Sequence, residues 1–507
     1  MNRKFLIHEL ENTFWDMVIV GGGATGLGVA LDAASRGLKV ALIEKNDYAS
    51  GPTSTSTKLI HGGVRYLEKA IKELDFGQFH LVKEALYERK IMLKNAPHIS
   101  NSIPFVIPIY SFWQKGYYFF GTRFYDWIAG NDNIPNSKTL SKNLTLQKFP
   151  LLNPNIQSSV LYYDGQFNDA FYATALMRTA SKYGACCLNY VQLNQVNFNQ
   201  NSNTYHLTAY DRLNSCNLNI QSKLLVNCGG VQADSIRKMV LPDLECRLRP
   251  SKGIHIVLPR EWLPTDHALL IPKTEDGRVI FIIPWYYATI IGTTDTEVHD
   301  FNQPPEVTEE DVEYLLKQVN PYLAQPIQKS DIIASFAGYR PLVKANKTKT
   351  EALIRNHEIE TFENKKFISV LGGKWTTYRK MAEDAVNEAF KLLNLPFVAC
   401  KTSSLPLIGA NSQKFENTNH LLEVVHQHLH YYGSEYPILV DYLEKFGKQP
   451  LVNGYPFTLG ECYFLKENCQ IHTFDDLIYR GTRLGIINFS AAEKLKNIRE
   501  IQDLFHY

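Results

Sequence analysis

The sequence lacks the residue spacings that disulfide frameworks and metal sites require. Its 507 residues include eight cysteines, but they form no Cys-x-x-Cys pair and no cysteine–histidine set with zinc-finger spacing. An Asp-x-Asp-x-Asp-Gly calcium loop is also absent. We therefore expect no bound metal, and free thiols of this kind are typical of a reducing compartment.

Long apolar runs and a strong net charge are missing as well. The uncharged stretch at 279–294 is shorter than the about 20 residues that a membrane-spanning helix needs, and Pro284 interrupts it. The first residues, Met1–Lys4, contain no apolar signal core, so we expect a cytoplasmic protein without a leader. A formal net charge of +2 argues against a nucleic-acid partner, and a hydrophobic content of 45% indicates a globular protein.

Near its N-terminus the chain carries the pattern of a dinucleotide-binding βαβ unit. An apolar run at 17–20 predicts a buried strand, a helix-like stretch follows at 27–36, and a second apolar run at 40–43 ends at Glu44. The turn after the first run has three glycines with Gly-x-Gly-x-x-Gly spacing: Gly21, Gly23 and Gly26. Such glycines allow a tight turn, the approach of a pyrophosphate and close helix–strand packing, while Glu44 can accept hydrogen bonds from a ribose.

Five hydroxyl residues at 53–57 lead directly into Lys-Leu-Ile-His-Gly-Gly at 58–63. Serine and threonine are poor helix formers, so this segment is either a linker or a loop whose hydroxyls contact a ligand. We favour the loop, because a glycine motif follows at once. The cofactor contacts that we expect in this segment are Ser54, Thr57 and His61.

The glycine motif, the Ser/Thr run and then Lys-Leu-Ile-His-Gly-Gly-x-Arg-Tyr-Leu-Glu together resemble the FAD-dependent glycerol-3-phosphate dehydrogenases. These belong to a wider flavoprotein group that includes glycine oxidase and D-amino-acid oxidase. The resemblance implies bound FAD and an α/β fold with three parts: a Rossmann-like FAD-binding domain of the glutathione-reductase and D-amino-acid-oxidase type, an antiparallel-sheet substrate domain and a helical C-terminal domain. The boundaries that we expect are 1–75, 150–240 and 335–398 for the FAD-binding domain, 76–149 and 241–334 for the substrate- and membrane-facing domain, and 399–507 for the C-terminal domain.

Further glycine turns extend the expected flavin site. Asn-Cys-Gly-Gly at 227–230 follows a strand, and Gly230 permits close backbone approach, although Val231 and Gln232 depart from the Pro-Trp that many related flavoproteins carry here. A second strand–glycine–helix junction begins with the strand at 367–370. The remaining cofactor contacts that we expect are Gly338, Gly372, Gly373 and Thr376.

We expect no part in the flavin site for Asp169 or for the region after residue 400. Asp169 stands at the start of a helical stretch at 170–183, where its carboxylate can cap the helix. The region after residue 400 carries no catalytic constellation, so we expect the flavin site to form without it.

Basic residues within the motifs that carry the resemblance indicate an anionic substrate. The substrate contacts that it implies are Arg65, Tyr66, Arg340, Arg355 and Lys374. Arginine forks bind phosphate oxygens in pairs, and lysine acts as a point charge. His255 is the leading general base because imidazole titrates near neutral pH, and His61, Lys374 and an arginine-bound water are the alternatives. The catalytic set that we expect is His255, Arg340, Lys374 and Arg65.

The resemblance, together with the basic residues in its motifs, implies oxidation of sn-glycerol 3-phosphate to dihydroxyacetone phosphate, with hydride transfer to FAD and electrons passed on to a quinone. Two alternatives are also oxidoreductases: a glycerol-3-phosphate oxidase that uses oxygen, and a related FAD-dependent amine or hydroxy-acid oxidase. A third belongs to a different class, a non-catalytic dinucleotide-fold binding protein, which would need no basic cluster near the flavin.

Aromatic residues recur every three or four positions within 103–132, with Lys115 and Arg123 among them. A buried core helix and a helix that lies in the membrane plane both fit this pattern. Because the resemblance implies electron transfer to quinone, we expect peripheral association with the inner face of the cell membrane, and a homodimer. The aromatic residues are Trp113, Tyr117, Phe120, Phe124 and Trp127.

Overall fold

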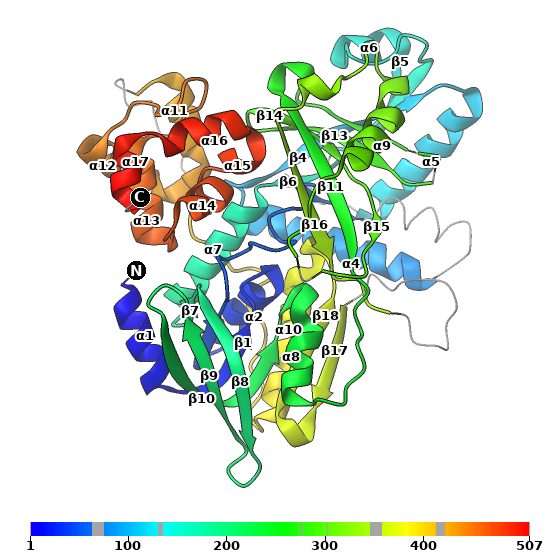
Figure 1. Ribbon diagram of the computed structural model, residues 1–507. Helices are drawn as coiled ribbons and strands as arrows, with labels where there is room; N and C mark the ends of the chain where they lie inside the picture. The colour runs from blue at the N-terminus through cyan, green and yellow to red at the C-terminus, as the bar shows by residue number, and fades with distance from the viewer. Residues whose placement is uncertain are drawn as a thin grey trace.

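In the computed structural model, two β-sheets and a group of C-terminal helices make up the molecule (Figure 1). The chain passes between the two sheets several times, so neither sheet is built from one continuous segment. The structure describes residues 2–62, 76–129, 135–272, 274–275, 277–301, 303–344, 357–411 and 421–505.

The first sheet has the strand order β17-β18-β10-β1-β2-β7. Its strands are β1 (Phe14–Val20), β2 (Val40–Ile43), β7 (Cys186–Leu188), β8 (Val191–Asn199), β9 (Thr204–Asp211), β10 (Cys216–Asn227), β17 (His357–Phe362) and β18 (Phe367–Gly372). β1 pairs in parallel with β2 and β10, and β10 pairs in parallel with β18. Parallel strands place their carboxyl ends at one edge, so the turns after β1, β10 and β18 all lie at the same edge of the sheet.

Helices cover both faces of this sheet, because successive side chains of a strand point to opposite faces. Met17 and Ile19 of β1 pack with α2, α7 and α10, whereas Val18 and Val20 pack with α1 and with Ile236 of α8. The helices are α1 (Arg3–Asn12), α2 (Ala24–Ser35), α7 (Asp169–Lys182), α8 (Ala233–Val240) and α10 (Tyr378–Leu392).

The second sheet is mostly antiparallel and has the order β15-β11-β14-β13-β12-β4-β6-β3, with β16 paired to β11 and β5 to β6. β3, β6 and β16 belong to this sheet, although the boundaries expected from the sequence group them with the FAD-binding segments. Its strands are β3 (Leu59–Ile60), β4 (Ser100–Ile109), β5 (Lys138–Ser141), β6 (Ser158–Phe167), β11 (Ser251–Pro259), β12 (Ala268–Ile271), β13 (Ile280–Trp285), β14 (Ala288–Gly292), β15 (Thr296–Glu297) and β16 (Ala334–Arg340).

Of the aromatic segment 103–132, residues 103–109 belong to β4, whereas the five recurring aromatic positions all lie on one helix, α5 (Phe112–Ala129). Tyr118 and Phe119 pack against the core on one face of the second sheet, whereas Phe120 is 73% exposed and Tyr117 is 45% exposed. The helix therefore has one buried face and one exposed aromatic face. The helices packed around the second sheet are α4 (Phe76–Asn95), α5 (Phe112–Ala129), α6 (Lys142–Lys148) and α9 (Glu309–Val319).

The C-terminal region is helical and has its own hydrophobic core (red and orange in Figure 1). Its helices are α11 (Glu423–Leu429), α12 (Tyr436–Phe446), α13 (Leu459–Cys469), α14 (Phe474–Asp476), a π-helical turn (Leu477–Gly481), α15 (Leu484–Ile487), α16 (Phe489–Lys496) and α17 (Arg499–Phe505). Ile486 and Ile487 of α15 join the core of the second sheet, so this region also packs against the rest of the molecule. Across the described ranges, we find no helix that combines the length and the apolar character needed to cross a membrane.

Candidate active site

The turn between β1 and α2 brings backbone atoms closer together than any side chain would permit. Gly21 has a φ of +114°, and a Cβ placed on it would lie 2.4 Å from the carbonyl oxygen of Cys228. A Cβ on Gly26 would lie 1.9 Å from the Gly21 carbonyl oxygen. Gly23 is the N-cap residue of α2, so no side chain stands at the start of the helix there. This arrangement fits a pyrophosphate held at a helix N-terminus.

Glu44, at the end of β2, fixes the same turn from the side. Its Oε2 accepts a hydrogen bond from the Gly22 N–H at 2.7 Å, and its Oε1 accepts one from the Asn46 N–H at 2.9 Å. Burial raises the pKa of this carboxyl, and the two backbone bonds oppose that rise. A carboxylate oxygen has two lone pairs, so each oxygen can still accept a ribose hydroxyl. The ribose role of Glu44 stays a prediction.

The hydroxyl loop, residues 53–57, lies between α2 and the second glycine junction. Thr53 Oγ1 accepts a hydrogen bond from the Ala24 N–H at 3.0 Å, and its carbonyl oxygen accepts one from Trp375 Nε1 at 2.7 Å. A Cβ on Gly338 of β16 would lie 2.0 Å from Thr55 Oγ1. Thr55 Oγ1 is buried without a hydrogen-bond partner in the described part of the chain. A buried hydroxyl without a partner, beside a glycine of β16, fits a polar cofactor group at this place.

The second glycine junction follows β18 at the same sheet edge. Gly372 and Gly373 have φ values of +70° and +91°, which is the region that favours glycine. Lys374 comes next as the N-cap of a short turn, and Thr376 Oγ1 donates a hydrogen bond to the His61 carbonyl oxygen at 3.4 Å. Gly230, after β10, also has a positive φ of +56°. The three glycine-containing turns of this edge therefore surround one region at the switch point of the sheet, where α/β proteins bind their ligands.

His255 of β11 and Arg340 of β16 extend from neighbouring antiparallel strands of the second sheet. His255 Nε2 lies 3.0 Å from Thr57 Oγ1, and its ring stacks on Phe336 with centroids 4.7 Å apart. Burial lowers the pKa of His255 well below its ordinary value, and the charges of Lys58 and Arg340 lower it further. The imidazole is therefore neutral near pH 7. Its buried Nδ1 has no protein partner among the residues that the structure describes.

Arg340 is held in place by polar groups of the turn after β14. Its Nη1 lies 3.0 Å from Asp295 Oδ1, and its Nη2 donates to the Thr294 carbonyl oxygen at 2.9 Å. A Cβ on Gly253 would lie 2.3 Å from Arg340 Nη2, so glycine leaves room for the guanidinium. The side chain is 29% exposed, and an anion from solution can therefore reach it.

The described residues account for only part of the expected substrate set. Arg340 and Lys374 are described, whereas Arg65, Tyr66 and Arg355 lie outside the described residues. The expected substrate contacts of Arg65, Tyr66 and Arg355 therefore stay predictions.

Sequence reasoning missed two buried polar groups that support the site. Tyr125 of α5 accepts a hydrogen bond from the Gly62 N–H at 2.9 Å and donates one to Asp164 Oδ2 at 3.1 Å, while Arg89 Nη1 lies 2.6 Å from Asp164 Oδ1. The second group joins Lys58, Asp169 and Arg483. The lysine of the Lys-Leu-Ile-His motif could have indicated this second group, but no pattern in the sequence distinguishes Arg483 from other arginines.

Asp169 does not cap α7, because the residue before it does. The Asn168 side chain accepts the N–H of Phe171 at 3.1 Å, which makes Asn168 the N-cap. Asp169 is the first helical residue and is fully buried against Lys58. The expected cap is therefore wrong by one position, and the carboxylate is available for ion pairing instead.

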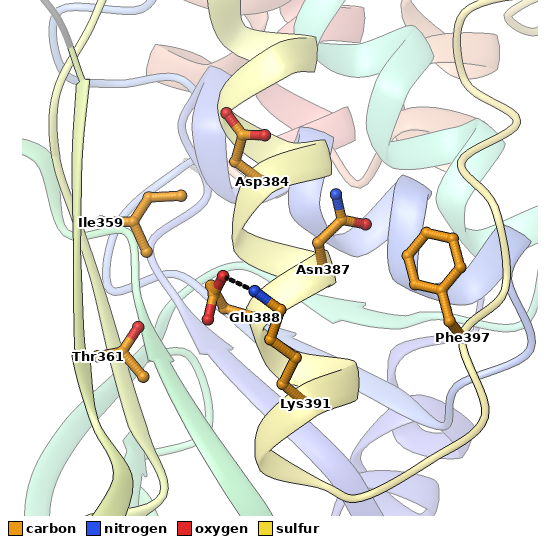
Figure 2. A pocket seen from close by; sticks show the side chains of 7 residues that line it. All are labelled: Ile359, Thr361, Asp384, Asn387, Glu388, Lys391 and Phe397. Carbon is orange, nitrogen blue, oxygen red and sulfur yellow. Dashed lines mark hydrogen bonds and ion pairs between the residues drawn. The ribbon is translucent and has the colours of Figure 1, made fainter.

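A surface groove lies away from these residues, between β17 and α10 (Figure 2). Figure 2 shows Ile359 and Thr361 on the strand facing the polar side chains of α10, with Phe397 at one side. None of the residues that line this groove belongs to the expected site. The lining residues are Ile359, Thr361, Asp384, Asn387, Glu388, Lys391 and Phe397.

The chain matches known proteins along almost its whole length. Residues 16–374 match the FAD dependent oxidoreductase family, and residues 400–505 match the C-terminal domain of alpha-glycerophosphate oxidase. The mitochondrial glycerol-3-phosphate dehydrogenase of Rattus norvegicus is 40% identical over 517 aligned residues, which cover 97% of this chain and 71% of the relative. The human protein of the same name is 39% identical, and its alignment also covers 97% of this chain and 71% of the relative.

Solved structures agree with the sequence matches. The glycerol-3-phosphate dehydrogenase from Bacillus halodurans, solved with FAD, superposes with a TM-score of 0.78 at 28% identity and covers 99% of this chain and 93% of its own. The L-alpha-glycerophosphate oxidase from Mycoplasma pneumoniae has a TM-score of 0.60 at 18% identity, covers 78% of this chain and 99% of its own, and thus shares the fold. The predicted fold class and the FAD cofactor are confirmed. With glycine turns that fit a dinucleotide, a buried histidine and a partly exposed arginine on the second sheet, and relatives at this identity, the chain belongs to the FAD-dependent glycerol-3-phosphate dehydrogenase family.

Proposed function

We propose that the protein oxidises sn-glycerol 3-phosphate to dihydroxyacetone phosphate and passes the electrons on to a quinone. The observation that carries this proposal is the position of His255 and Arg340. They stand on neighbouring strands whose residues touch the hydroxyl loop, which in turn contacts the start of α2. A base and a phosphate-binding cation thus stand beside the place that fits the flavin.

Arg340 binds the substrate phosphate in this proposal. Its fork is already oriented by Asp295 and the Thr294 carbonyl, so little side-chain freedom is lost when an anion binds. Lys374, at the second glycine junction, adds a point charge, and Arg65, Tyr66 and Arg355 remain proposed contacts.

His255 takes the hydroxyl proton in this proposal. If its Nε2–H donates to Thr57 Oγ1, the Nδ1 lone pair is the free acceptor, and burial keeps the ring neutral beforehand. FAD, when bound, supplies the hydride acceptor for the carbon-bound hydrogen. A buried imidazole is a weak base in isolation, so proton transfer must accompany loss of the hydride rather than precede it.

Peripheral membrane association at the inner face of the cell membrane is part of the same proposal. α5 exposes Tyr117 and Phe120 on one side, and Lys115 and Arg123 are exposed as well. Aromatic rings with basic neighbours suit the lipid–water interface, and an enzyme there can reach a quinone. Homodimerisation is also proposed, and light scattering in detergent-free buffer measures it.

The acceptor has a second candidate, because the C-terminal family is named for an oxidase and an oxidase of this fold is known. Anaerobic mixing with glycerol 3-phosphate tests the first half-reaction, and bleaching of the flavin absorbance is the expected result. Admitting a soluble quinone analogue or oxygen to the reduced protein then distinguishes the acceptors. An absence of bleaching with a fully FAD-loaded protein would contradict the proposed substrate, and fast reoxidation by oxygen alone would favour the oxidase. Bleaching by an amine or a hydroxy acid in its place would favour the related oxidases.

A further inference from the structure

A buried group of three charged residues joins segments that are far apart in the sequence. Lys58 Nζ lies 2.7 Å from Asp169 Oδ2, and Arg483 Nη2 lies 3.1 Å from Asp169 Oδ1. All three side chains are at most 2% exposed. Two cations thus share one carboxylate in the interior, which is costly, because burying an incompletely compensated charge opposes folding. Stability alone is a poor reason for such an arrangement.

The same three residues hold the hydroxyl loop. The Ser54 carbonyl oxygen accepts hydrogen bonds from Lys58 Nζ at 2.6 Å and from Arg483 Nη2 at 2.7 Å. Ser56 Oγ donates to Asp169 Oδ2 at 2.7 Å and accepts from the Lys58 N–H at 3.0 Å. The loop is therefore anchored at two positions by charged groups, which make stronger hydrogen bonds than neutral ones.

The last residue of the hydroxyl loop contacts His255. Thr57, the residue after Ser56, lies 3.0 Å from His255 Nε2. Lys58 Nζ also lies 4.9 Å from the centroid of the Phe336 ring, which stacks on His255. The cluster thus reaches His255 through a hydrogen bond on one side and through a stacked ring on the other.

We propose that Lys58 and Arg483 are positioning residues of the reaction centre: through Asp169 and the Ser54 carbonyl they fix the hydroxyl loop, so that the direct contacts of Arg483, a residue of the C-terminal region, help to set the orientation of Thr57 and His255. The catalytic half of this proposal rests on the proposed function, and the structural half does not. It runs against the expectation that the region after residue 400 is dispensable for the flavin site.

A matched control exists, because other contacts dock the C-terminal region without touching the loop. Arg178 of α7 and Glu435 form a bidentate ion pair, with Nη2 and Oε1 2.6 Å apart. Glu435→Gln weakens the docking of the C-terminal region and leaves the three-residue cluster intact. Any effect of Arg483→Met that Glu435→Gln reproduces is a docking effect only.

Hydrogen exchange of the FAD-loaded proteins tests the anchoring without an activity measurement. In Arg483→Met, amides of residues 50–62 should exchange about tenfold faster, the change expected when a charged hydrogen bond is lost. In Glu435→Gln they should exchange as in the wild type. Unchanged exchange at 50–62 in a folded Arg483→Met protein overturns the proposal. If that variant does not fold, Arg483→Lys, which keeps the charge and loses the fork, takes its place with the same expectation and the same refuting result.

The pH profile separates positioning from a merely structural role. The charged and titratable groups that face Lys58 are Asp169, Arg483 and His255, and Tyr286 faces Arg483. Burial lowers the pKa of Lys58 to about 7; Asp169 opposes this and Arg483 adds to it. The protonated lysine makes a charged hydrogen bond to the Ser54 carbonyl oxygen, which is stronger than the bond that a neutral amine would make. The loop is therefore held less firmly when Lys58 loses its proton, and kcat/KM should fall on the alkaline side.

In Arg483→Met the alkaline limb of kcat/KM should move to higher pH, because the pKa of Lys58 rises when the neighbouring cation is removed. The maximal kcat/KM should fall by about 100-fold, the loss typical of a misplaced catalytic group. A lower maximum with an unmoved limb would overturn the electrostatic link between Arg483 and Lys58. If the wild type does not oxidise glycerol 3-phosphate, the proposed function fails, and the exchange experiment still decides whether the cluster anchors the loop.

Discussion

Replacing Arg340 with alanine tests whether its guanidinium binds the substrate phosphate. Loss of one partner from a buried charge pair typically costs about 2–5 kcal/mol. The Arg340 side chain is 29% exposed, so water screens part of the interaction and the lower end, about 2–3 kcal/mol, is expected. At tenfold per 1.36 kcal/mol, kcat/KM for glycerol 3-phosphate should fall by about 30- to 150-fold.

Asp295 provides a second way to examine the same interaction. It lies 3.0 Å from Arg340 Nη1, so in Arg340→Ala its carboxylate loses this cation and repels an incoming phosphate. Adding Asp295→Asn to Arg340→Ala should therefore restore part of the lost kcat/KM. Arg340→Lys, which keeps the charge and loses the fork, should lie between the wild type and Arg340→Ala.

Glycerol is the control substrate, because it has no phosphate. We would measure kcat/KM for glycerol 3-phosphate and for glycerol with the wild type and Arg340→Ala, using an artificial electron acceptor. Glycerol should be a poor substrate of the wild type, and Arg340→Ala should change its kcat/KM little. Equal losses on both substrates would refute the phosphate assignment and leave Arg340 a structural residue.

Three further predictions concern the cofactor, the membrane and pH. Glu44→Ala should raise the Kd for FAD by an amount equivalent to about 1.5–3 kcal/mol, because a charged acceptor is lost, and an unchanged Kd in a fluorescence titration would contradict the ribose placement. Phe120→Ser combined with Tyr117→Ser should reduce liposome binding while FAD is retained, whereas Tyr183→Ser, at an exposed aromatic on α7's end, should not; equal binding by all proteins would count against an interfacial α5. Burial lowers the pKa of His98 to about 4, so between about pH 6.5 and 4 only the unfolded chain binds this proton, and the free energy of unfolding should fall with acidification by up to roughly 1.4 kcal/mol per pH unit. Burial also lowers the pKa values of His472 and His255, so His98→Gln should reduce the slope of pH-dependent urea unfolding by the contribution of one proton, and an unchanged slope would contradict the assignment to His98.

The βαβ unit could be predicted from the sequence because its requirements are local. A Cβ on Gly26 would collide with the carbonyl of Gly21, only five positions away, so the spacing of the motif follows from a contact within one turn. Met17–Val20 is an apolar run that is packed in the sheet, and α2 is buried along almost its whole length. The family resemblance also rested on contiguous motifs, for the same reason.

The sequence could not distinguish a buried helix from an interfacial one, because the same aromatic spacing fits both environments. The aromatic spacing of 103–132 fits both a core helix and an interfacial helix, and α5 has features of each: Tyr118 packs in the core, whereas Phe120 is exposed. Which face is covered depends on the second sheet, whose strands come from segments up to hundreds of residues away. Periodicity in the sequence indicates that a helix has an apolar face. Whether that face is buried or exposed depends on the elements that pack against the helix in the folded protein.

By itself, then, the sequence determined the glycine turns, the parallel strands that carry them and the family of the chain. Only the tertiary structure decided that Lys58, Asp169 and Arg483 form one charged cluster. The Ser54 carbonyl and Arg483 are 429 positions apart, and no local spacing relates them. Long-range ion pairs of this kind arise from how the packed elements meet, because the energetic cost of a buried charge depends on which partners surround it in the folded state.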